Sequence, residues 1–370
     1  MSEREFRLLM LVPSVGGPFG EQVELLVSHL RGQGVRVFLA VPSRYHDEGR
    51  PRHADDWAFS SAGGLAGRAV RLFSPVTLWS LARRLFRLKP DCVYVYGGEA
   101  YPPTVLALLL CRMFGLRCVL SVHDVVPHPG KFFDFAYGKI RVPFLRLPSL
   151  LHTFSEHGRE ILARRFPRQA VVWSPLLDLA EIYLRYPAAA PAIGKRILCF
   201  GRVEPYKDIP CVVEAFAKLR RSRADATLRI VGKNGLGRRL FELTEGVAGC
   251  EVVDRFLPPR ALAEELSQAH ACILAYTEAS HSGSAELALA FGCNVVATKV
   301  AAFSAMAGEP GVFLFEPGDA GDCAGRLLEA VTAPTRARDP QRALRLEASN
   351  RARTREFMDA IGLSGARTPA

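Results

Sequence analysis

The stretch Ala271–Phe291 reads ACILAYTEASHSGSAELALAF and has the pattern of a strand, a polar loop and a helix. Its apolar start, residues 271–276, predicts a buried strand, and its Ala/Leu-rich end, residues 285–291, predicts a helix that Gly292 closes. The polar residues between them form a loop at the carboxyl end of the strand. Such a unit presents the free N–H groups of a helix N-terminus, where anions bind.

Two glutamates, Glu278 and Glu286, bracket this loop. Glu286 falls in the first turn of the expected helix, where a carboxylate complements the helix dipole. The simplest explanation for Glu278 is that its carboxylate is exposed to solvent on the loop. Ser282, Gly283 and Ser284 offer hydroxyl and backbone donors at the helix start, and Ser282 also fits an N-cap.

A second strand-loop-helix unit lies upstream, with the loop FGRVEPYKD at residues 200–208. Gly201 permits a sharp turn at the strand end, and Arg202 and Lys207 follow it. Two cations at the carboxyl edge of a parallel sheet can clamp a diphosphate, Arg as a planar fork and Lys as a point charge. Ordinary surface charges explain this loop equally well when it is considered alone, and the downstream glutamate pair favours the diphosphate.

Taken together, these residues resemble the C-terminal half of the retaining glycosyltransferases of family 4. That family has the GT-B fold, two Rossmann-like α/β domains whose parallel sheets face each other across a cleft. The resemblance implies that Arg202 and Lys207 hold the diphosphate of a sugar nucleotide. It also implies that Glu278 contacts the donor sugar and that Glu286 accepts hydrogen bonds from the ribose hydroxyls. The family has Gly-Phe-Gly directly after the first glutamate, whereas this chain has residues 279–281, Ala-Ser-His, so the donor sugar is not defined.

Three further positions extend the implied donor site. Lys233, in the turn after an expected strand at 227–231, is a second phosphate candidate, although a surface lysine is the simpler explanation. Arg255 and Phe256 follow the next strand and, by the same resemblance, border the base of the nucleotide.

The N-terminal half agrees with the same family. Gly16 and Gly17 follow a buried strand at 6–12 and permit close approach of a phosphate or sugar, although a plain tight turn also explains them. A strand at 118–122 leads into His123 and Asp124. The resemblance implies that His123 reaches the donor sugar or the attacking oxygen. Asp124 is then placed to orient the imidazole or to bind an acceptor hydroxyl, and a purely structural histidine is the alternative.

Length and composition predict a two-domain α/β protein, because 370 residues with 49% hydrophobic content suffice for two buried parallel sheets. We expect an N-terminal domain at residues 1–185, a nucleotide-sugar-binding domain at 186–345, and a crossover helix and tail at 346–370. Residues 178–195 are expected to be the linker. Phe357 and Met358 are expected to anchor the last helix.

The net charge of +11 calls for an anionic partner. No nucleic-acid-binding module is recognisable, so nucleic acid is not expected. The basic, aromatic segment at 131–146 fits either a face that lies on an anionic bilayer and meets a lipid-linked acceptor, or a helix packed on its domain. No apolar run has membrane-spanning length and residues 1–5 lack the layout of a secretory signal. We therefore expect a cytoplasmic protein, either free or peripheral on the inner face of the cytoplasmic membrane.

The nine cysteines include no Cys-x-x-Cys pair, which is typical of a reducing compartment. No Asp-x-Asp motif occurs, so the sequence predicts neither a bound metal nor a cofactor beyond the co-substrate. We expect a hexosyltransferase that moves a sugar from a nucleoside diphosphate sugar to a hydroxyl acceptor, such as a lipid-linked glycan or polysaccharide precursor. A non-catalytic sugar-nucleotide-binding protein and a sugar-nucleotide epimerase on the same fold are the alternatives.

Overall fold

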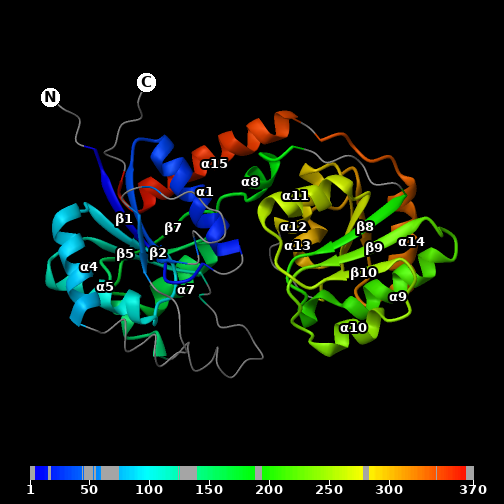
Figure 1. The fold of residues 1–370 in the computed structure, drawn as a ribbon. Coiled ribbons are helices and arrows are strands. Elements are labelled where there is room, and N and C mark those ends of the chain that lie inside the picture. Colours follow the sequence, from blue (N-terminus) through cyan, green and yellow to red (C-terminus); the bar gives the residue numbers. More distant parts are fainter. Residues whose placement is uncertain are drawn as a thin grey trace. The chain divides into compact units, whose positions relative to one another are not determined.

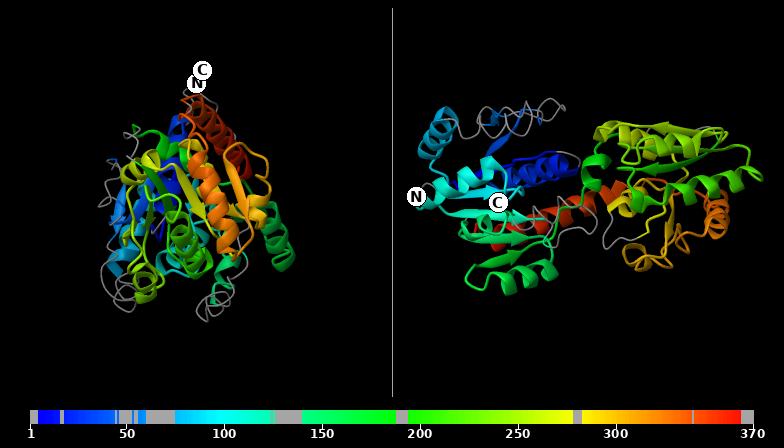
Figure 2. Two further views of the ribbon diagram at one scale, coloured as in Figure 1. Left: turned by 90° about the vertical axis from the view of Figure 1, so that its right-hand side faces the viewer. Right: turned by 90° about the horizontal axis from the view of Figure 1, so that it is seen from below.

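A computed structural model describes residues 5–15, 18–43, 45, 53, 56–59, 75–123, 125, 140–187, 194–277, 283–338 and 340–363. The chain divides into two compact units. The N-terminal unit comprises Met1–Leu177 and Ala348–Ala370, and the C-terminal unit comprises Asp178–Glu347 (Figure 1). Each unit is a parallel sheet with helices on both faces (Figures 1 and 2). The predicted α/β class with two parallel sheets is confirmed.

The sheet of the N-terminal unit has the strand order β3-β2-β1-β4-β5-β6-β7 and is parallel throughout. Its strands are β1 (Arg7–Leu11), β2 (Arg36–Pro42), β3 (Trp57–Phe59), β4 (Cys92–Val95), β5 (Cys118–Val122), β6 (Leu150–Thr153) and β7 (Val171–Trp173). The central strands β1, β4 and β5 are almost entirely buried, which explains why they read as continuous apolar runs.

The helices of the N-terminal unit cover both faces of this sheet. They are α1 (Pro18–Gly32), α4 (Pro75–Leu88), α5 (Pro102–Met113), α7 (Glu156–Arg165), the 3-10 helix η1 (Phe144–Arg146) and the end of α15 (Pro340–Ala360). Leu85 of α4, Leu108 of α5 and Leu162 of α7 share one core cluster with strand residues. The Phe357 ring packs edge-on against Tyr94, with ring centroids 5.1 Å apart, and Phe357 and Met358 are both buried, as predicted for anchors.

The sheet of the C-terminal unit has the order β10-β9-β8-β11-β12-β13 and is also parallel. Its strands are β8 (Lys195–Phe200), β9 (Ala226–Val231), β10 (Cys250–Val253), β11 (Ala271–Leu274), β12 (Asn294–Thr298) and β13 (Val312–Phe315). Strands β8 and β11 are neighbours in the sheet although β9 and β10 lie between them in sequence. The chain therefore reverses its direction of winding between β8 and β11, and in open α/β sheets ligands bind at the carboxyl ends of the strands beside such a switch point.

Helices cover both faces of the C-terminal sheet (Figure 1). One face carries α9 (Ile209–Arg220), α10 (Arg238–Thr244) and α14 (Ala320–Thr332), and the other carries α8 (Ala180–Leu184), α11 (Pro259–Gln268), α12 (Gly283–Ala290) and α13 (Ala301–Ser304). Phe216 of α9 and Leu327 of α14 are fully buried in one core cluster with strand residues such as Ile197 and Ile273.

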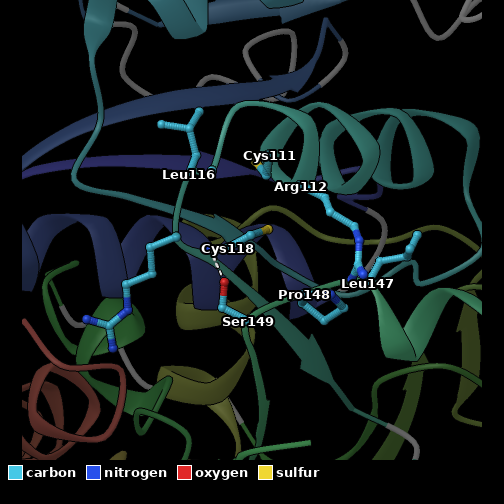
Figure 3. Close-up of a pocket in the computed structure, with 9 residues that line it drawn as sticks. Cys111, Arg112, Leu116, Cys118, Leu147, Pro148 and Ser149 are labelled. Carbon is cyan, nitrogen blue, oxygen red and sulfur yellow. Dashed lines mark hydrogen bonds between the residues drawn. The ribbon is translucent and has the colours of Figure 1, made fainter.

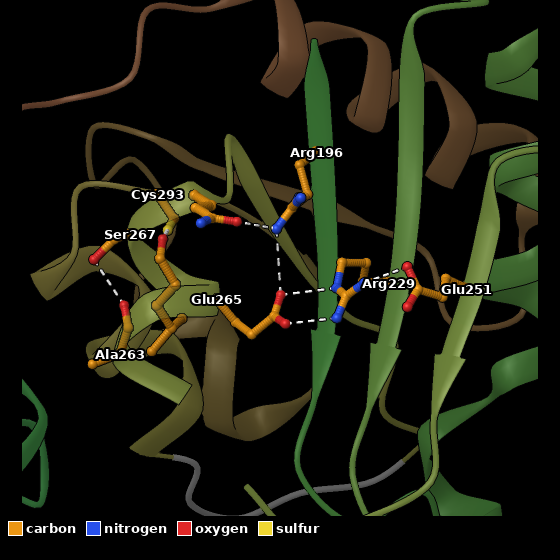
Figure 4. A network of polar contacts seen from close by, with 9 residues as sticks. Arg196, Arg229, Glu251, Ala263, Glu265, Ser267 and Cys293 are labelled. Atoms are coloured by element: carbon orange, nitrogen blue, oxygen red, sulfur yellow. Dashed lines mark hydrogen bonds and ion pairs between the residues drawn. The ribbon is translucent and has the colours of Figure 1, made fainter. Parts of the chain in front are cut away.

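A polar network fixes α11 to its sheet (Figure 4). Arg229 of β9 donates two hydrogen bonds to Glu265 of α11, at 2.7 and 2.9 Å, and it also contacts Glu251 of β10. Arg196 of β8 lies 3.5 Å from the same Glu265 carboxylate. A bidentate guanidinium-carboxylate pair has a fixed geometry, so the network sets the position of α11 across three strands.

The segment expected to be a linker is partly structured. Residues 180–184 form α8, all five residues are buried, and the helix packs against α11 and α12. The proline and alanine content at 187–191 pointed to a linker, but the apolar side chains of Ile182, Tyr183 and Leu184 find a surface to cover only in the folded unit. The units divide instead after Leu177 and again after Glu347.

All nine cysteines lie in the part of the chain that the structure describes, and all are free thiols. Among the helices of the described ranges, none combines the length and apolar character that crossing a bilayer requires.

Candidate functional site

The loop after β8 places Lys207 at the carboxyl edge of the C-terminal sheet. The loop begins with Gly201, whose φ of +88° is a left-handed conformation that favours glycine, and continues through a 3-10 helix, η2 (Pro205–Lys207). This short helix turns the Lys207 side chain back to the strand, where Nζ donates to the Phe200 carbonyl oxygen at 2.5 Å. A Cβ at position 201 would lie 2.9 Å from Lys207 Nζ, so the absence of a side chain at Gly201 provides the space that the ammonium occupies.

Lys207 is buried, and no described carboxylate is paired with it. Its side chain is 4% exposed, and none of the acidic residues that the structure describes forms an ion pair with it. Burial lowers the pKa of Lys207 because the charged form loses its hydration. The ammonium also lies 5.4 Å from the centre of the Tyr276 ring. An ammonium has three donors, so one carbonyl acceptor leaves capacity for an anionic ligand.

The loops after β8 and β11 meet at the switch point of this sheet. Thr277 donates from its backbone N–H to the Tyr206 carbonyl oxygen at 2.7 Å. The Tyr206 and Tyr276 rings make an edge contact with centroids 5.4 Å apart. Lys207 therefore lies at the position where a doubly wound sheet binds its ligand.

The glutamate loop is described only at its two ends. Glu278 and Ser282 lie outside the described residues. Helix α12 starts at Gly283, and Tyr276 donates from its hydroxyl to Ser284 Oγ at 3.3 Å, which connects the helix start with the end of β11. Glu286 lies in the first turn of α12, as the sequence predicted, and it is exposed.

Arg202 lies on the same loop as Lys207 but points to solvent. Its side chain is 66% exposed, and its guanidinium is 3.9 Å from the Glu204 carboxylate. An exposed pair at this distance is weak, so the guanidinium can exchange Glu204 for another anion.

The other donor-side candidates lie at the exits of β9 and β10. Lys233 is exposed, and its carbonyl accepts from Val203 N at 3.0 Å, which ties this turn to the Arg202 loop. Arg255 and Phe256 follow β10, and both are exposed. The topology thus places Arg202, Lys207, Lys233, Arg255 and Phe256 on one edge of one sheet.

In the N-terminal unit, His123 sits at the end of β5 inside an aromatic cluster. Its ring centroid is 4.7 Å from those of Phe19 and Tyr96 and 4.2 Å from that of Phe154. Burial lowers the pKa of His123 to about 3, so the imidazole is neutral at physiological pH. Nε2 is buried and has no hydrogen-bond partner among the described residues. Asp124, Gly16 and Gly17 lie outside these residues.

A buried ion pair near this edge was missed by the sequence analysis. Glu99 follows β4, and its carboxylate lies 3.4 Å from the Arg141 guanidinium, with both side chains about 5% exposed. Arg141 also donates to the Val125 carbonyl oxygen at 3.0 Å. The signal was present as Tyr96-Gly97-Gly98-Glu99, a polar, glycine-rich exit from an apolar strand, and this exit adjoins β1 at the switch point of the N-terminal sheet.

An open pocket of 440 Å³ in the N-terminal unit lies elsewhere (Figure 3). Arg112, Leu116 and Arg117 line it together with Pro148 and Ser149. These residues lie just before β5 or just before β6, whereas His123 directly follows the last residue of β5. The pocket therefore belongs to the amino edge of the sheet and is distinct from the candidate site.

Two family models match this chain. The model of Glycosyltransferase Family 4 matches residues 20–181, and the model of Glycosyl transferases group 1 matches residues 194–333. A comparison with curated proteins found no match.

Solved structures share the fold across nearly the whole chain. A glycosyltransferase from Rickettsia africae is 15% identical with a TM-score of 0.59, covering 98% of this chain and 96% of its own. A sucrose-phosphate synthase from Thermosynechococcus elongatus is 17% identical with a TM-score of 0.58, covering 97% of each chain. A UDP-N-acetylglucosamine 2-epimerase is 13% identical with a TM-score of 0.66, covering 99% of each chain. Because the family matches lie on both units and together span most of the chain, the protein belongs to the glycosyltransferases of family 4 and group 1 and has the GT-B fold.

Proposed function

We propose that this glycosyltransferase moves a hexose from a nucleoside diphosphate sugar to a hydroxyl acceptor, with retention of the anomeric configuration and without a metal ion. The observation that carries the proposal is the buried Lys207 ammonium at the switch point of the C-terminal sheet. Holding an unpaired cation in a desolvated position is unfavourable unless an anion joins it. A diphosphate has the charge and the oxygen acceptors that this position lacks.

Lys207 and Arg202 would then bind the diphosphate in different ways. Lys207 is fixed by its contact with Phe200 and supplies a preorganised charge, whereas the exposed Arg202 leaves Glu204 and closes on the phosphates as a planar fork. As the glycosidic bond breaks, negative charge grows on the departing diphosphate. Cations already in position stabilise that charge more than they stabilise the bound substrate, and this difference accelerates transfer. The N–H groups at the start of α12, near Ser284, would add to the effect.

Further side chains are assigned to the donor sugar and to its acceptor. Glu286 is assigned to the ribose hydroxyls and Glu278 to the donor sugar, since an ionised carboxylate accepts from two neighbouring hydroxyls. His123, neutral because burial lowers its pKa, is assigned to the donor sugar or the attacking oxygen, with Asp124 beside it. We assign no carboxylate as a nucleophile. We therefore favour attack of the acceptor hydroxyl on the same face of the donor sugar as the leaving group, assisted by a phosphate oxygen.

The acceptor that we favour is a lipid-linked glycan or a polysaccharide precursor. The net charge of +11 favours an anionic surface, and a lipid-linked acceptor would be presented at one. We accordingly propose that the enzyme works in the cytoplasm at the inner face of the cytoplasmic membrane.

The test combines donor binding with product analysis. Thermal shifts with uridine, guanosine and adenosine diphosphate sugars identify the donor, and NMR of the product reports the anomeric configuration. We expect one nucleotide class to stabilise the wild type, Lys207→Met to abolish that stabilisation, and Lys218→Met, in an exposed ion pair with Glu214, to leave it unchanged. Stabilisation that survives Lys207→Met would exclude the assigned site. If an epimeric sugar nucleotide forms in the absence of an acceptor, the activity is epimerisation and the proposed sugar transfer is wrong.

A further inference from the structure

The outer faces of α4 and α5 in the N-terminal unit carry large apolar side chains that the fold leaves exposed. Trp79 and Phe86 of α4 are 63% and 61% exposed, and Leu109 and Met113 of α5 are 48% and 66% exposed. The spacing within each pair places its two members on one side of their helix. The two helices are in contact, and the Phe86 ring packs against that of Phe114, directly after Met113, with centroids 4.7 Å apart.

Packing inside the unit does not account for these side chains. Helix α4 already has an inner face, on which Ala82, Leu85 and Leu88 join the core cluster. Single exposed apolar residues are common on protein surfaces and need no explanation. Here the exposed residues lie on two touching helices, which Figure 1 shows side by side in the N-terminal unit. They form one patch, which implies a partner for it.

The charges around the patch indicate the chemistry of that partner. Arg83 and Arg87 of α4 are exposed, and the Arg83 guanidinium lies 5.1 Å from the centre of the Trp79 ring. Arg112 is exposed between Leu109 and Met113. Neither α4 nor α5 contains an acidic residue. Aromatic and long aliphatic groups interleaved with arginines suit the boundary between lipid headgroups and acyl chains, where the apolar parts enter the membrane and the guanidinium groups stay with the phosphates.

We propose that the surface formed by Trp79, Arg83, Phe86, Arg87, Leu109 and Met113, the α4/α5 face, docks on an anionic lipid bilayer. This inference deepens the proposed function, on which it rests for its biological purpose, by naming the surface that meets the membrane of a lipid-linked acceptor.

The experiment measures binding of the full chain to sedimenting vesicles of phosphatidylcholine, with and without phosphatidylglycerol. We expect binding only to the vesicles that contain phosphatidylglycerol, and a blue shift of tryptophan emission on binding. Trp79→Ser with Phe86→Ser, and separately Arg83→Gln with Arg87→Gln, should each reduce partitioning by roughly tenfold or more, since the first pair removes buried apolar area and the second removes charge near the surface. Thermal melting verifies that the variants fold.

A matched control lies on α10 of the C-terminal unit, where Arg238 and the 49% exposed Phe241 combine the same side-chain types. Arg238→Gln with Phe241→Ser should bind vesicles like the wild type. The proposal is overturned if the wild type does not bind, if phosphatidylglycerol makes no difference, or if the α4 variants bind normally. It is also overturned if the face proves to join two copies of the chain, seen as a dimer that Trp79→Ser dissociates. None of these results affects donor binding, which Lys207→Met tests separately.

Discussion

The Lys207 ammonium lies 2.5 Å from the carbonyl oxygen of Phe200, seven residues before it, at the end of the strand that the loop leaves. The chain leaves β8, turns at Gly201 and returns through η2, so that the Lys207 ammonium is buried beside the end of β11.

Lys207→Met preserves most of the side-chain length and removes the charge. We expect kcat/KM to fall by roughly 10²–10³, because a preorganised charge on the leaving group is lost. The melting temperature should stay the same or rise, since no buried cation remains to be desolvated. Steady-state kinetics and thermal melting provide both values, with Lys218→Met as the control. Turnover near the wild-type value would contradict the role of Lys207.

Diphosphate affinity should decline at alkaline pH. Burial lowers the pKa of Lys207 below its ordinary value of 10.5, so between the folded-state pKa and 10.5 the unfolded chain binds more protons. Stability therefore rises with pH in that window, while affinity for a diphosphate falls as the ammonium deprotonates. Calorimetric titration of the nucleoside diphosphate across an alkaline pH series measures this. Lys207→Arg, whose guanidinium stays charged, should bind with little pH dependence, and a wild type with an equally flat profile would refute the prediction.

Gly201→Ala should weaken both stability and donor binding. The new Cβ would require a left-handed backbone at φ +88° and would lie 2.9 Å from Lys207 Nζ, so we expect a loss of about 1–3 kcal/mol in the free energy of unfolding and a displaced ammonium. Gly246→Ala is the matched control. Its φ is +73°, but the new Cβ would meet no atom within 4 Å, so it should cost stability without affecting donor affinity. Equal affinity losses in the two variants would mean that backbone strain alone is responsible.

His123 should make the protein sensitive to acid. The pKa of its imidazole is about 3 in the folded chain and 6.5 ordinarily, so below pH 6.5 the unfolded state binds the extra proton and stability falls as the pH decreases towards 3. At pH 5 this single group should cost about 2 kcal/mol relative to pH 7. Urea unfolding at the two pH values measures the difference, and His123→Phe, which suits the aromatic cluster, should reduce it. An unchanged difference in the variant would show that His123 is not the group responsible.

Breaking the Glu99–Arg141 pair should cost about 3–5 kcal/mol, because Glu99→Leu leaves a buried guanidinium without its partner carboxylate. Arg141→Met should be similarly destabilising. The double variant should recover most of the loss, since neither buried charge remains. A double-mutant cycle in urea measures the coupling, and additive losses would show that the two groups act independently.

The order and type of the elements could be predicted from the sequence, and so could the strand ends that carry polar groups. Buried parallel strands such as β5 and β12 read as apolar runs, and Gly201 and Gly292 mark the places where chain direction changes. Local pattern is enough for these features because each depends on residues close together in the chain. It also placed Arg202 and Lys207 on one loop, at the carboxyl edge where the structure has them.

Other features depend on contacts between residues that are far apart in sequence, so they could not be predicted from the local pattern. The pattern showed Lys207 as a charge on a polar loop, whereas its burial against Phe200 and Tyr276 requires β11 to lie beside β8. Glu99 and Arg141 come together only when β4, β5 and β6 align. His123 meets its three aromatic neighbours only when β1 lies beside these strands as well. Residues 180–184 form a buried helix because α11 and α12 provide the surface that their apolar side chains cover. Desolvation and pairing of charges are properties of packed neighbours, which a linear pattern does not specify.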